Sequence, residues 1–529
     1  MTNSRRRPPV SELKSRNVRA GGVDGVTRFN AMSSVIGHWL RRVRLGEITL
    51  DEAWAAVCDH NAALIAPPWE EPRLRREFDA LLRKDQAAHA AREPQPAPFS
   101  DDALAAAFVA EHGDDFRHIA LSKRWMRWCS DHWASDDKRA VLQLIRQTCR
   151  AEAHRADKPS EARRLSSRRA IEAVERIAAA DPYVAVGPNA FDMPTMLLNT
   201  PDGVVDLETG VVGPHRRDLL LSRIAGAGPG GPRKRWDAFI AEVTGGDTEL
   251  AAYIKRVAGY CLTGSTREQV FFFLHGAGAN GKSVFLNTLA AALGDYARPV
   301  PFETFSATRT PSHPTELASL LGVRLALVAE TDRNRAWAES RIKSIAGGDA
   351  ISARYMRGDF FEFRPMCKLI VSGNHRPALT SFGEAMRRRL HLVPFDVTIP
   401  PERRDRDLEM RLLEELGGVL AWMIEGCAEW REKGLAPPLK VQAAVDEYFA
   451  EEDLVGQWLA ERCELAPGLW IQSETLFKDW CAFAEAHGHH QGSFRDLLAE
   501  LKGRSCHPHR TAKARGVNGI ALRSRGPIS

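Results

Sequence analysis

A run of eight residues, Gly276 to Ser283, has the spacing G-x-x-x-x-G-K-S. Glycines at both ends of such a loop let backbone N–H groups turn inward, where they can bind phosphate oxygens. Lys282 adds a positive charge within reach of the terminal phosphates, and Ser283 adds a hydroxyl that can bind Mg²⁺. The lining residues would be Gly276, Ala277, Gly278, Ala279, Asn280, Gly281, Lys282 and Ser283. The spacing therefore predicts a site for ATP with Mg²⁺.

The flanking sequence predicts the elements that hold this loop. Val270 to Leu274 is an apolar run of strand length directly before it. Behind it, apolar residues recur with the spacing of one helical face, and Gly294 can end that helix. The positions on this face are Val284, Phe285, Thr288, Leu289, Ala292 and Leu293. A strand, a loop and a helix in this order place phosphate at a helix N-terminus, where the dipole favours negative charge.

A second glycine pattern is a weaker candidate. Gly226, Gly228 and Gly231 satisfy G-x-G-x-x-G, but Pro229 and Pro232 interrupt it and no helical pattern opens directly behind. The segment GAGPGGPRKR is therefore expected to be a linker rather than a dinucleotide site.

Hydrolysis of ATP also needs a carboxylate, a polar group near the γ-phosphate and a cationic side chain that stabilises the negatively charged transition state. The stretch VRLALVAETD contains an apolar strand pattern that ends at Glu330. The stretch KLIVSGNHRP contains a second one that ends at Asn374. Arg387 to Arg389 precede a third run, LHLVPF. Singly, each could be a solvated strand end, a turn or a surface basic run. Their order after the glycine loop favours a nucleotide site, because such sites form where buried strands end.

Taken together, residues 269–395 resemble a superfamily 3 helicase of the phage/plasmid primase-helicase type, a group related to AAA+ ATPases. The stretches that carry the resemblance are GAGANGKS, LALVAETD, IKSIAGGDAISARYM, KLIVSGNHRP and RRRLHLVPF, with LLNTPDGVVDLETGVVGPH upstream. The resemblance implies an α/β P-loop core of AAA+ type. It also implies an ATP hydrolase, and catalytic roles for Lys282, Glu330 and Asn374. One departure is that Ala329 stands where the family pairs a second acid with Glu330.

The same resemblance implies an assembly. The family's arginine finger corresponds to Arg388 or Arg389 and reaches the ATP of a neighbouring subunit, so a homo-hexameric ring is expected. Glu330 would share the Mg²⁺ with Ser283. A separate primase is a possible further partner, because we recognise no polymerase domain in the chain.

Nucleic acid is expected at two places. The pattern of SARYMRGDFFEF, which starts at Ser352, predicts a hairpin, and the resemblance implies that this hairpin lies in the ring channel. There Arg354, Arg357 and Lys343 could contact phosphates. Tyr355 could stack on a base. An ordinary surface hairpin is the alternative. The track would be single-stranded or forked DNA.

The C-terminal sequence is the second place. No Asp or Glu follows Glu500, whereas seven basic residues do: Lys502, Arg504, Arg510, Lys513, Arg515, Arg523 and Arg525. Two short helical patterns and a strand pattern here resemble a winged-helix module, with the helix that begins near Ser493 as the DNA reader. A solvated basic tail is the alternative. The nearby His487, His489, His490, Cys506, His507 and His509 match no standard zinc finger spacing.

The chain length of 529 residues and the linker-like stretches indicate several domains. The expected fold is multidomain, with mostly helical N-terminal domains before the α/β core. Three helical patterns are expected from Phe29 to about Lys84, mostly helical sequence from Ser100 to about Ala180, and a hairpin in GVVDLETGVV. The expected segments are a flexible basic arm (1–27), a small helical module like that following primase domains (28–86), a linker (87–99), a helical and β domain (100–232), the ATPase core (233–435) and a winged-helix-like domain (445–529).

The overall composition excludes few classes of protein. The net charge is only +5, which alone does not establish nucleic-acid binding, and the nine cysteines include no Cys-x-x-Cys pair. No apolar run approaches a membrane span, so a cytoplasmic protein without membrane contact is expected. A helicase in phage or plasmid replication is the favoured function. A bifunctional primase-helicase and an ATP-binding origin or assembly protein without motor activity remain alternatives.

Overall fold

The computed structural model describes residues 18–19, 28–44, 48–90, 96–306, 314–329, 337–356, 358–374, 376, 384–487, 491–510 and 514–523. The chain divides into two compact units, residues 1–103 and 104–529. Among the helices of these ranges, none is both long and apolar enough to cross a membrane.

The first unit is a small helical bundle. It contains α2 (Arg28–Arg44), α3 (Leu50–Leu64) and α4 (Glu71–Ala90), and the short strands β1 (Val18–Arg19) and β2 (Ile65–Ala66) pair in parallel. Thr49 and Glu52 form a capping box at the start of α3, which fixes where that helix begins. Apolar residues of all three helices form one core. The three helical patterns expected in this region are confirmed.

A helical and β region follows the bundle along the chain and continues into the second unit. Ser100 accepts a hydrogen bond from the N–H of Ala103 and caps α5 (Asp101–His112). Four strands follow in the order β5-β4-β3-β6, and the helices α6 (Ala140–Arg155), α7 (Pro159–Leu165) and α8 (Arg168–Ala179) connect β5 to β6. The strands are β3 (Phe116–Ile119), β4 (Arg124–Trp128), β5 (Trp133–Ser135) and β6 (Ala185–Val186).

The region up to Ala180 is mostly helical, as expected, but the strands β3 to β5 within it were not predicted. Strands β3 to β5 are only three to five residues long, which is too short for their alternation to stand out from a helical pattern. Their pairing is fixed by tertiary packing, in which Trp125, Met126 and Trp133 are buried.

A three-stranded meander links this region to the central sheet. It contains β7 (Leu197–Thr200), β8 (Gly203–Asp206) and β9 (Val212–Gly213), which confirms the expected hairpin. The GAGPGGPRKR segment that follows was expected to be a linker, and this expectation is wrong. The N–H of Gly226 donates to the carbonyl of Ala292, and that of Gly230 donates to Gly417. A Cβ on Gly226 would lie 1.9 Å from the Ala291 carbonyl oxygen, so glycine here permits close backbone packing rather than flexibility.

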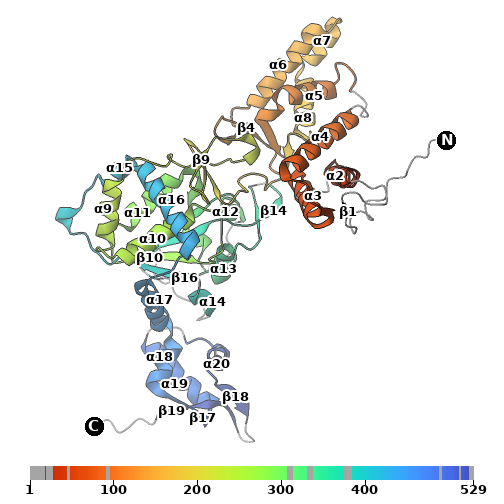
Figure 1. The fold of residues 1–529 in the computed structure, drawn as a ribbon. Coiled ribbons are helices and arrows are strands. Elements are labelled where there is room, and N and C mark those ends of the chain that lie inside the picture. Colours follow the sequence, from red (N-terminus) through yellow and green to blue (C-terminus); the bar gives the residue numbers. More distant parts are fainter. Residues whose placement is uncertain are drawn as a thin grey trace. The chain divides into compact units, whose positions relative to one another are not determined.

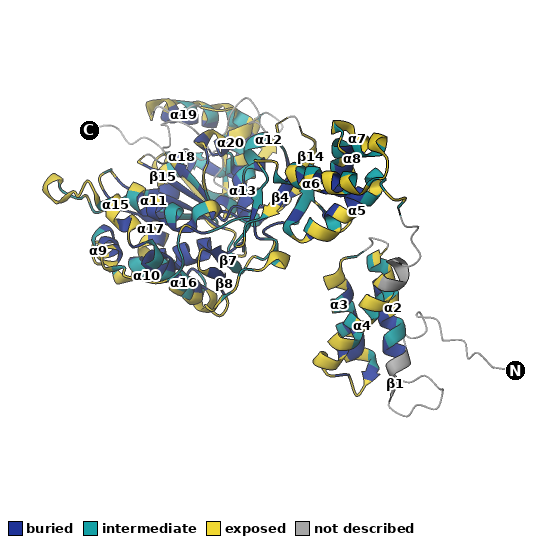
Figure 2. Ribbon diagram, turned by 90° about the horizontal axis from the view of Figure 1, so that it is seen from above, coloured by how far each residue is buried: buried dark blue, intermediate teal, exposed yellow. Residues whose placement is uncertain are grey.

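Five parallel strands form the central sheet, in the order β11-β12-β15-β10-β16 (Figure 1). They are β11 (Ala297–Pro299), β12 (Leu325–Ala329), β15 (Lys368–Gly373), β10 (Phe271–His275) and β16 (Leu390–Pro394). Both faces are buried, and Figure 2 shows the strands in dark blue. Phe272 and Leu274 of β10 join one apolar cluster, whereas Phe271 and Phe273 join the other. The strands therefore read as continuous apolar runs, as is typical of a parallel sheet covered on both sides.

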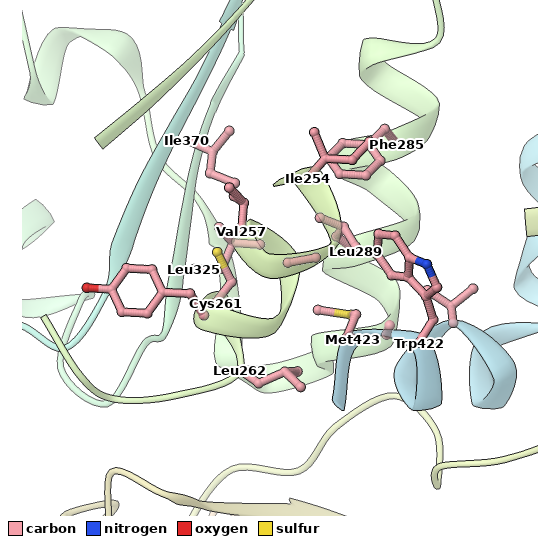
Figure 3. Close-up of a cluster of buried hydrophobic side chains, with 14 of the residues drawn as sticks. Ile254, Val257, Cys261, Leu262, Phe285, Leu289, Leu325, Ile370, Trp422 and Met423 are labelled. Atoms are coloured by element: carbon pink, nitrogen blue, oxygen red, sulfur yellow. The ribbon is translucent and has the colours of Figure 1, made fainter. Parts of the chain in front are cut away.

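The two clusters bring the covering helices onto the sheet. The first cluster contains residues of α9 (Lys234–Val243), α10 (Thr248–Cys261), α11 (Lys282–Leu293) and α16 (Leu416–Lys433). Figure 3 shows part of it, with Phe285 and Leu289 of α11 near Trp422 and Met423 of α16. The second contains residues of α12 (Pro314–Ala318), α13 (Glu339–Gly347), α14 (Glu384–Arg387), α17 (Leu439–Glu452) and the hairpin of β13 (Ile351–Arg354) and β14 (Phe360–Phe363). A short helix, α15 (Leu408–Leu413), precedes α16.

The C-terminal part has a core of its own. Its elements follow the order α18 (Leu454–Arg462), β17 (Cys463–Gln472), α19 (Ser473–Ala486), α20 (Phe494–Lys502), β18 (His507–Arg510) and β19 (Arg515–Leu522). The strands form a sheet in the order β17-β19-β18. Val445, Tyr448 and Phe449 of α17 belong to the core of the central sheet, so the separate C-terminal core begins after that helix. The prediction of a multidomain α/β chain with a parallel sheet is thus confirmed.

Candidate nucleotide site

The glycine loop connects β10 to α11, as its flanking patterns predicted. Gly278 and Gly281 have φ angles of +105° and +81°, a backbone region that favours glycine. Gly281 is also the residue before α11, so the loop ends directly at a helix N-terminus. A Cβ on Gly276 would lie 2.1 Å from Nδ2 of Asn280 and 2.2 Å from the Phe395 carbonyl oxygen. The loop conformation therefore depends on these glycines.

The loop is fastened to the end of the neighbouring strand. Nδ2 of Asn280 donates to the carbonyl of Phe395 at 2.8 Å, and the N–H of Ile399 donates to the carbonyl of Ala279 at 2.8 Å. Asn280 is 3% exposed, so this side chain is a buried anchor of the loop.

Lys282 lies at the centre of the site. Its Nζ donates to the Gly276 carbonyl at 2.8 Å, to Oδ1 of Asn280 at 3.0 Å and to Oδ1 of Asn374 at 3.2 Å. The residue is only 5% exposed. An ammonium group held at the mouth of a glycine loop by neutral oxygens carries an uncompensated positive charge, which phosphate oxygens can bind.

Asn374 reaches Lys282 because of the strand register. It follows β15 directly, and Gly373 of β15 pairs with His275, the last residue of β10. Parallel strands end at one edge of the sheet, so the residue after β15 and the loop after β10 meet there. This arrangement is consistent with the prediction that the glycine loop and Asn374 share a site.

Strand β12, which precedes Glu330 in the sequence, ends at the same edge, because its last residue, Ala329, pairs with Ser372 of β15. Glu330 itself lies outside the described residues. Ser283 is the second residue of α11 and is exposed.

Burial alters the titration of two groups at this edge. It lowers the pKa of Lys282. It also lowers the pKa of His275, which Arg376 and Lys282 lower further, whereas Asp396 and Glu447 raise it. His275 directly precedes the loop, so burial and these two cations favour its neutral imidazole.

The candidate finger arginines lie at the opposite edge of the same sheet. The carbonyl of Arg389 accepts a hydrogen bond from the N–H of Phe271, the first residue of β10, whereas Lys282 follows the far end of that strand. The five residues of β10 separate the two edges by roughly 16 Å. These arginines therefore do not share a site with the glycine loop of their own chain.

The three adjacent arginines have different surroundings. Arg387 pairs with Asp446 at 2.7 Å, and Arg389 donates to the Ala385 carbonyl at 2.9 Å. Arg388 is exposed, and no hydrogen bond or ion pair involves its side chain within the described part of the chain.

The expected hairpin is present as β13 and β14, with Arg354 opposite Phe360. The guanidinium of Arg354 lies over the Phe360 ring at 5.1 Å, and Tyr355 stacks on Phe361 at 5.0 Å. Lys343 of α13 pairs with Glu339 at 3.1 Å. Arg357 lies outside the described residues.

The most exposed apolar groups of this hairpin were not predicted from the sequence. Met356 is 75% exposed and Phe360 is 59% exposed, whereas Tyr355 is half-buried. The sequence FFEF could have identified Phe360, because alternate residues of a strand share a face and Phe360 shares the face of the charged Glu362, opposite Phe361 and Phe363.

The C-terminal candidates are partly described. Ser493 and Asp496 form a capping box at the start of α20, so the expected helix begins where predicted. Arg504 pairs with Asp453 at 2.6 Å, whereas Lys502, Arg510, Arg515 and Arg523 are exposed. Lys513, Arg525, His489 and His490 lie outside the described ranges. Within those ranges, no three His, Cys, Asp or Glu side chains form a group that could hold a metal.

Comparisons with known proteins agree with the motifs. Residues 105–245 match the D5 N terminal like family, and residues 274–389 match a family of unknown function, DUF5906. "Putative helicase 022R" of Frog virus 3 (isolate Goorha) is 30% identical over 283 residues, which is 49% of this chain and 29% of that protein. "Putative helicase L207/L206" of Acanthamoeba polyphaga mimivirus is 26% identical over 236 residues, 40% of this chain and 25% of that protein. The chain thus matches less than a third of the length of either relative.

Among solved structures, the apo form of the NrS-1 C-terminal region covers 80% of this chain and 100% of its own, at 9% identity and a TM-score of 0.44. The family match and the viral relatives place the similarity among helicase-related proteins. The predicted resemblance is confirmed to this extent: parts of the chain are similar to proteins of the phage primase-helicase type.

Proposed function

We propose that the chain is an ATP-dependent DNA helicase of superfamily 3 that acts in phage or plasmid replication. The observation that carries the proposal is the meeting of Lys282 with Asn280 and Asn374 at the carboxyl edge of the parallel sheet. These groups come from a glycine loop and from the end of the adjacent strand, the two places from which α/β proteins bind and hydrolyse nucleotides.

ATP is the proposed substrate, and the residues present fit its triphosphate. The loop offers backbone N–H groups at a helix N-terminus, and the three oxygens that now hold Nζ of Lys282 can be replaced by phosphate oxygens. Lys282 would bind the β- and γ-phosphates, and the Asn374 amide would orient the water that attacks the γ-phosphate. Glu330 would accept a proton from that water. Mg²⁺, bound with ATP through Ser283 and Glu330, would supply charge neutralisation.

The arginines support a ring of identical subunits, which we propose to be a hexamer. Arg388 and Arg389 lie at the sheet edge remote from the loop of their own chain. A positive charge placed there can stabilise the transition state only in another subunit. Of the two, we assign Arg388 as the finger, because Arg389 is held by the Ala385 carbonyl while Arg388 is exposed.

The DNA contacts of the proposed motor are assigned to two places. The exposed Phe360 and the Arg354 beside it belong to the β13–β14 hairpin, where Lys343, Tyr355 and Arg357 were also expected to contact a single strand. The order of helices and strands in the C-terminal core supports a winged helix, and we propose α20 as its DNA-reading helix.

The test is strand separation on a forked DNA with wild-type protein. Separation with ATP, and none with a non-hydrolysable analogue, is the expected result. ATP turnover without separation would contradict the motor and favour an ATP-using assembly protein. Primer synthesis by this chain alone would favour a bifunctional primase-helicase.

A further inference from the structure

Basic residues are concentrated in one internal segment that the proposed motor does not use. The arginine-rich segment, Lys138–Arg176, contains eleven Lys or Arg and five Asp or Glu, whereas the whole chain carries a net charge of only +5. It comprises α6, α7 and α8, and α6 packs against both of the others. An excess of this kind within one compact group of helices indicates an electrostatic surface rather than a general property of the chain.

The fold of the segment directs the charges to solvent. Val141, Ile145 and Cys149 lie at successive turns of one face of α6 and are at most 1% exposed. Leu165, at the end of α7, and Val174 of α8 are fully buried. Because the apolar side chains fill the space between the helices, the basic side chains occupy the outside. Figure 2 shows exposed positions along α6 and α7.

Acidic neighbours neutralise only part of this charge. Arg155 pairs with Glu152, and Arg168 pairs with Glu172. Four further cations, Arg150, Lys158, Arg163 and Arg169, are exposed and form no ion pair within the described part of the chain. These four are available to an external anion.

Charge is densest at the turn between α7 and α8, where the sequence is R-R-L-S-S-R-R. Two arginines precede the turn and two follow it, all four are exposed, and the buried Leu165 anchors the turn to the helices beneath. Ser167 accepts a hydrogen bond from the N–H of Ala170 and fixes the start of α8. Arg163 and Arg169 are therefore displayed on a turn whose backbone is fixed.

The residue types indicate the partner. Nine of the eleven cations are arginines, whose planar guanidinium binds phosphate through two parallel hydrogen bonds. The segment contains no Phe, Trp or Tyr, the side chains on which unpaired bases stack in single-strand sites. Arginine without aromatic residues suits the regularly spaced phosphates of a double helix, bound without regard to base sequence.

We propose that the arginine-rich segment binds double-stranded DNA through its phosphates. The inference rests on the proposed function, because it adds a duplex contact to a motor that tracks a single strand. Such a contact would hold the parental duplex next to the enzyme that separates it.

The experiment compares wild-type protein with the variant R150Q/R163Q/R169Q. Binding is measured to a blunt duplex and to a single strand of the same sequence, across a range of salt concentrations. The variant should lose about tenfold in duplex affinity, and its salt dependence should be shallower by about 0.9 for each phosphate contact removed. Single-strand affinity and single-strand-stimulated ATP hydrolysis should be unchanged. Circular dichroism of the variant should match the wild type, because all three side chains are exposed.

A matched control changes the charge of the same segment in the opposite direction. In D157N/E161Q, two acidic groups near the start of α7 are neutralised, so duplex affinity should rise. Unchanged duplex affinity in the folded R150Q/R163Q/R169Q variant would overturn the proposal, as would an equal loss for both DNA forms. If the wild type neither hydrolyses ATP nor separates strands, the proposed function fails, but the duplex measurement still decides the binding claim.

Discussion

Nζ of Lys282 donates a hydrogen bond to Oδ1 of Asn374 at 3.2 Å, although 92 positions separate the two residues in the chain. The parallel pairing of β10 with β15 produces this contact, because His275 and Gly373 are register partners at the ends of their strands. The two motifs therefore form one site by virtue of the sheet.

The first prediction concerns Asn374. In Asn374→Ala, ATP should still bind, because Lys282 keeps its contacts with Gly276 and Asn280. The kcat for ATP hydrolysis should fall by about 10²–10³, the usual cost of losing one polar group that acts on a transition state. Steady-state kinetics measure both quantities. Asn287→Ala, at an exposed position of α11, is the control and should hydrolyse ATP normally. A normal kcat for Asn374→Ala would remove the residue from the site.

The second prediction concerns the close packing of the loop. Gly276→Ala places a Cβ 2.1 Å from Nδ2 of Asn280 and 2.2 Å from the Phe395 carbonyl oxygen, so the loop must move. ATP affinity, measured by calorimetry, should weaken at least about tenfold, which is about 1.4 kcal/mol. Gly187→Ala has no atom within 4 Å of the added carbon and should bind ATP as the wild type does. Equal affinities of the two variants would show that the loop tolerates a side chain.

The third prediction uses mixed rings. Lys282→Ala and Arg388→Ala proteins should each be inactive, because one lacks the phosphate-binding cation and the other the proposed finger. A mixture should regain part of the ATP hydrolysis, since some interfaces then combine an intact loop with an intact arginine from the neighbour. Trans-acting fingers typically contribute about 10³–10⁵ in rate, so the regained activity is measurable. A mixture as inactive as its components would argue against a shared interface, and a fully active Arg388→Ala would point to Arg389.

The fourth prediction is a pH dependence that arises from Lys368, the first residue of β15. This side chain is 2% exposed, and burial lowers its pKa from 10.5 to about 7. Between these two values the unfolded chain binds the proton and the folded chain does not. The contribution of Lys368 to the free energy of unfolding therefore rises with pH, by up to about 1.4 kcal/mol per pH unit.

Denaturant unfolding of wild type and Lys368→Met, from pH 7 to pH 10, isolates this contribution from other groups that titrate in the same range. The wild type should gain stability relative to Lys368→Met as pH rises. Lys433→Met, at an exposed position, should follow the wild type. A constant difference between wild type and Lys368→Met would mean that Lys368 does not lose its proton on folding.

The elements around the nucleotide site could be predicted because their signals are local. The apolar run of β10, the glycine loop and the one-sided pattern of α11 lie within about 25 consecutive residues. The end of β15 at Asn374 was equally readable from an apolar run with a polar residue after it. Their meeting needed only the rule that parallel strands end at one edge.

Features set by distant contacts were missed. Strands β3 to β5 are held by tryptophans that pack across the region, and the Gly226 to Gly230 segment is fixed by carbonyls of Ala292 and Gly417. From the sequence alone, the region of β3 to β5 was expected to be helical and the Gly226 to Gly230 segment to be a linker. In the hairpin, sequence favoured Tyr355 for stacking, but its ring packs on Phe361 and leaves Phe360 exposed. Which of two neighbouring aromatic rings is exposed depends on the strand register, and the pairing of Arg354 with Phe360 sets it.

The central claim is that Lys282 serves ATP hydrolysis at this sheet edge, and the most direct test is the steady-state ATP hydrolysis rate of wild type and Lys282→Ala with and without single-stranded DNA. The account predicts DNA-stimulated turnover by the wild type and background turnover by the variant under both conditions. Equal rates from the two proteins would contradict the assignment of the site.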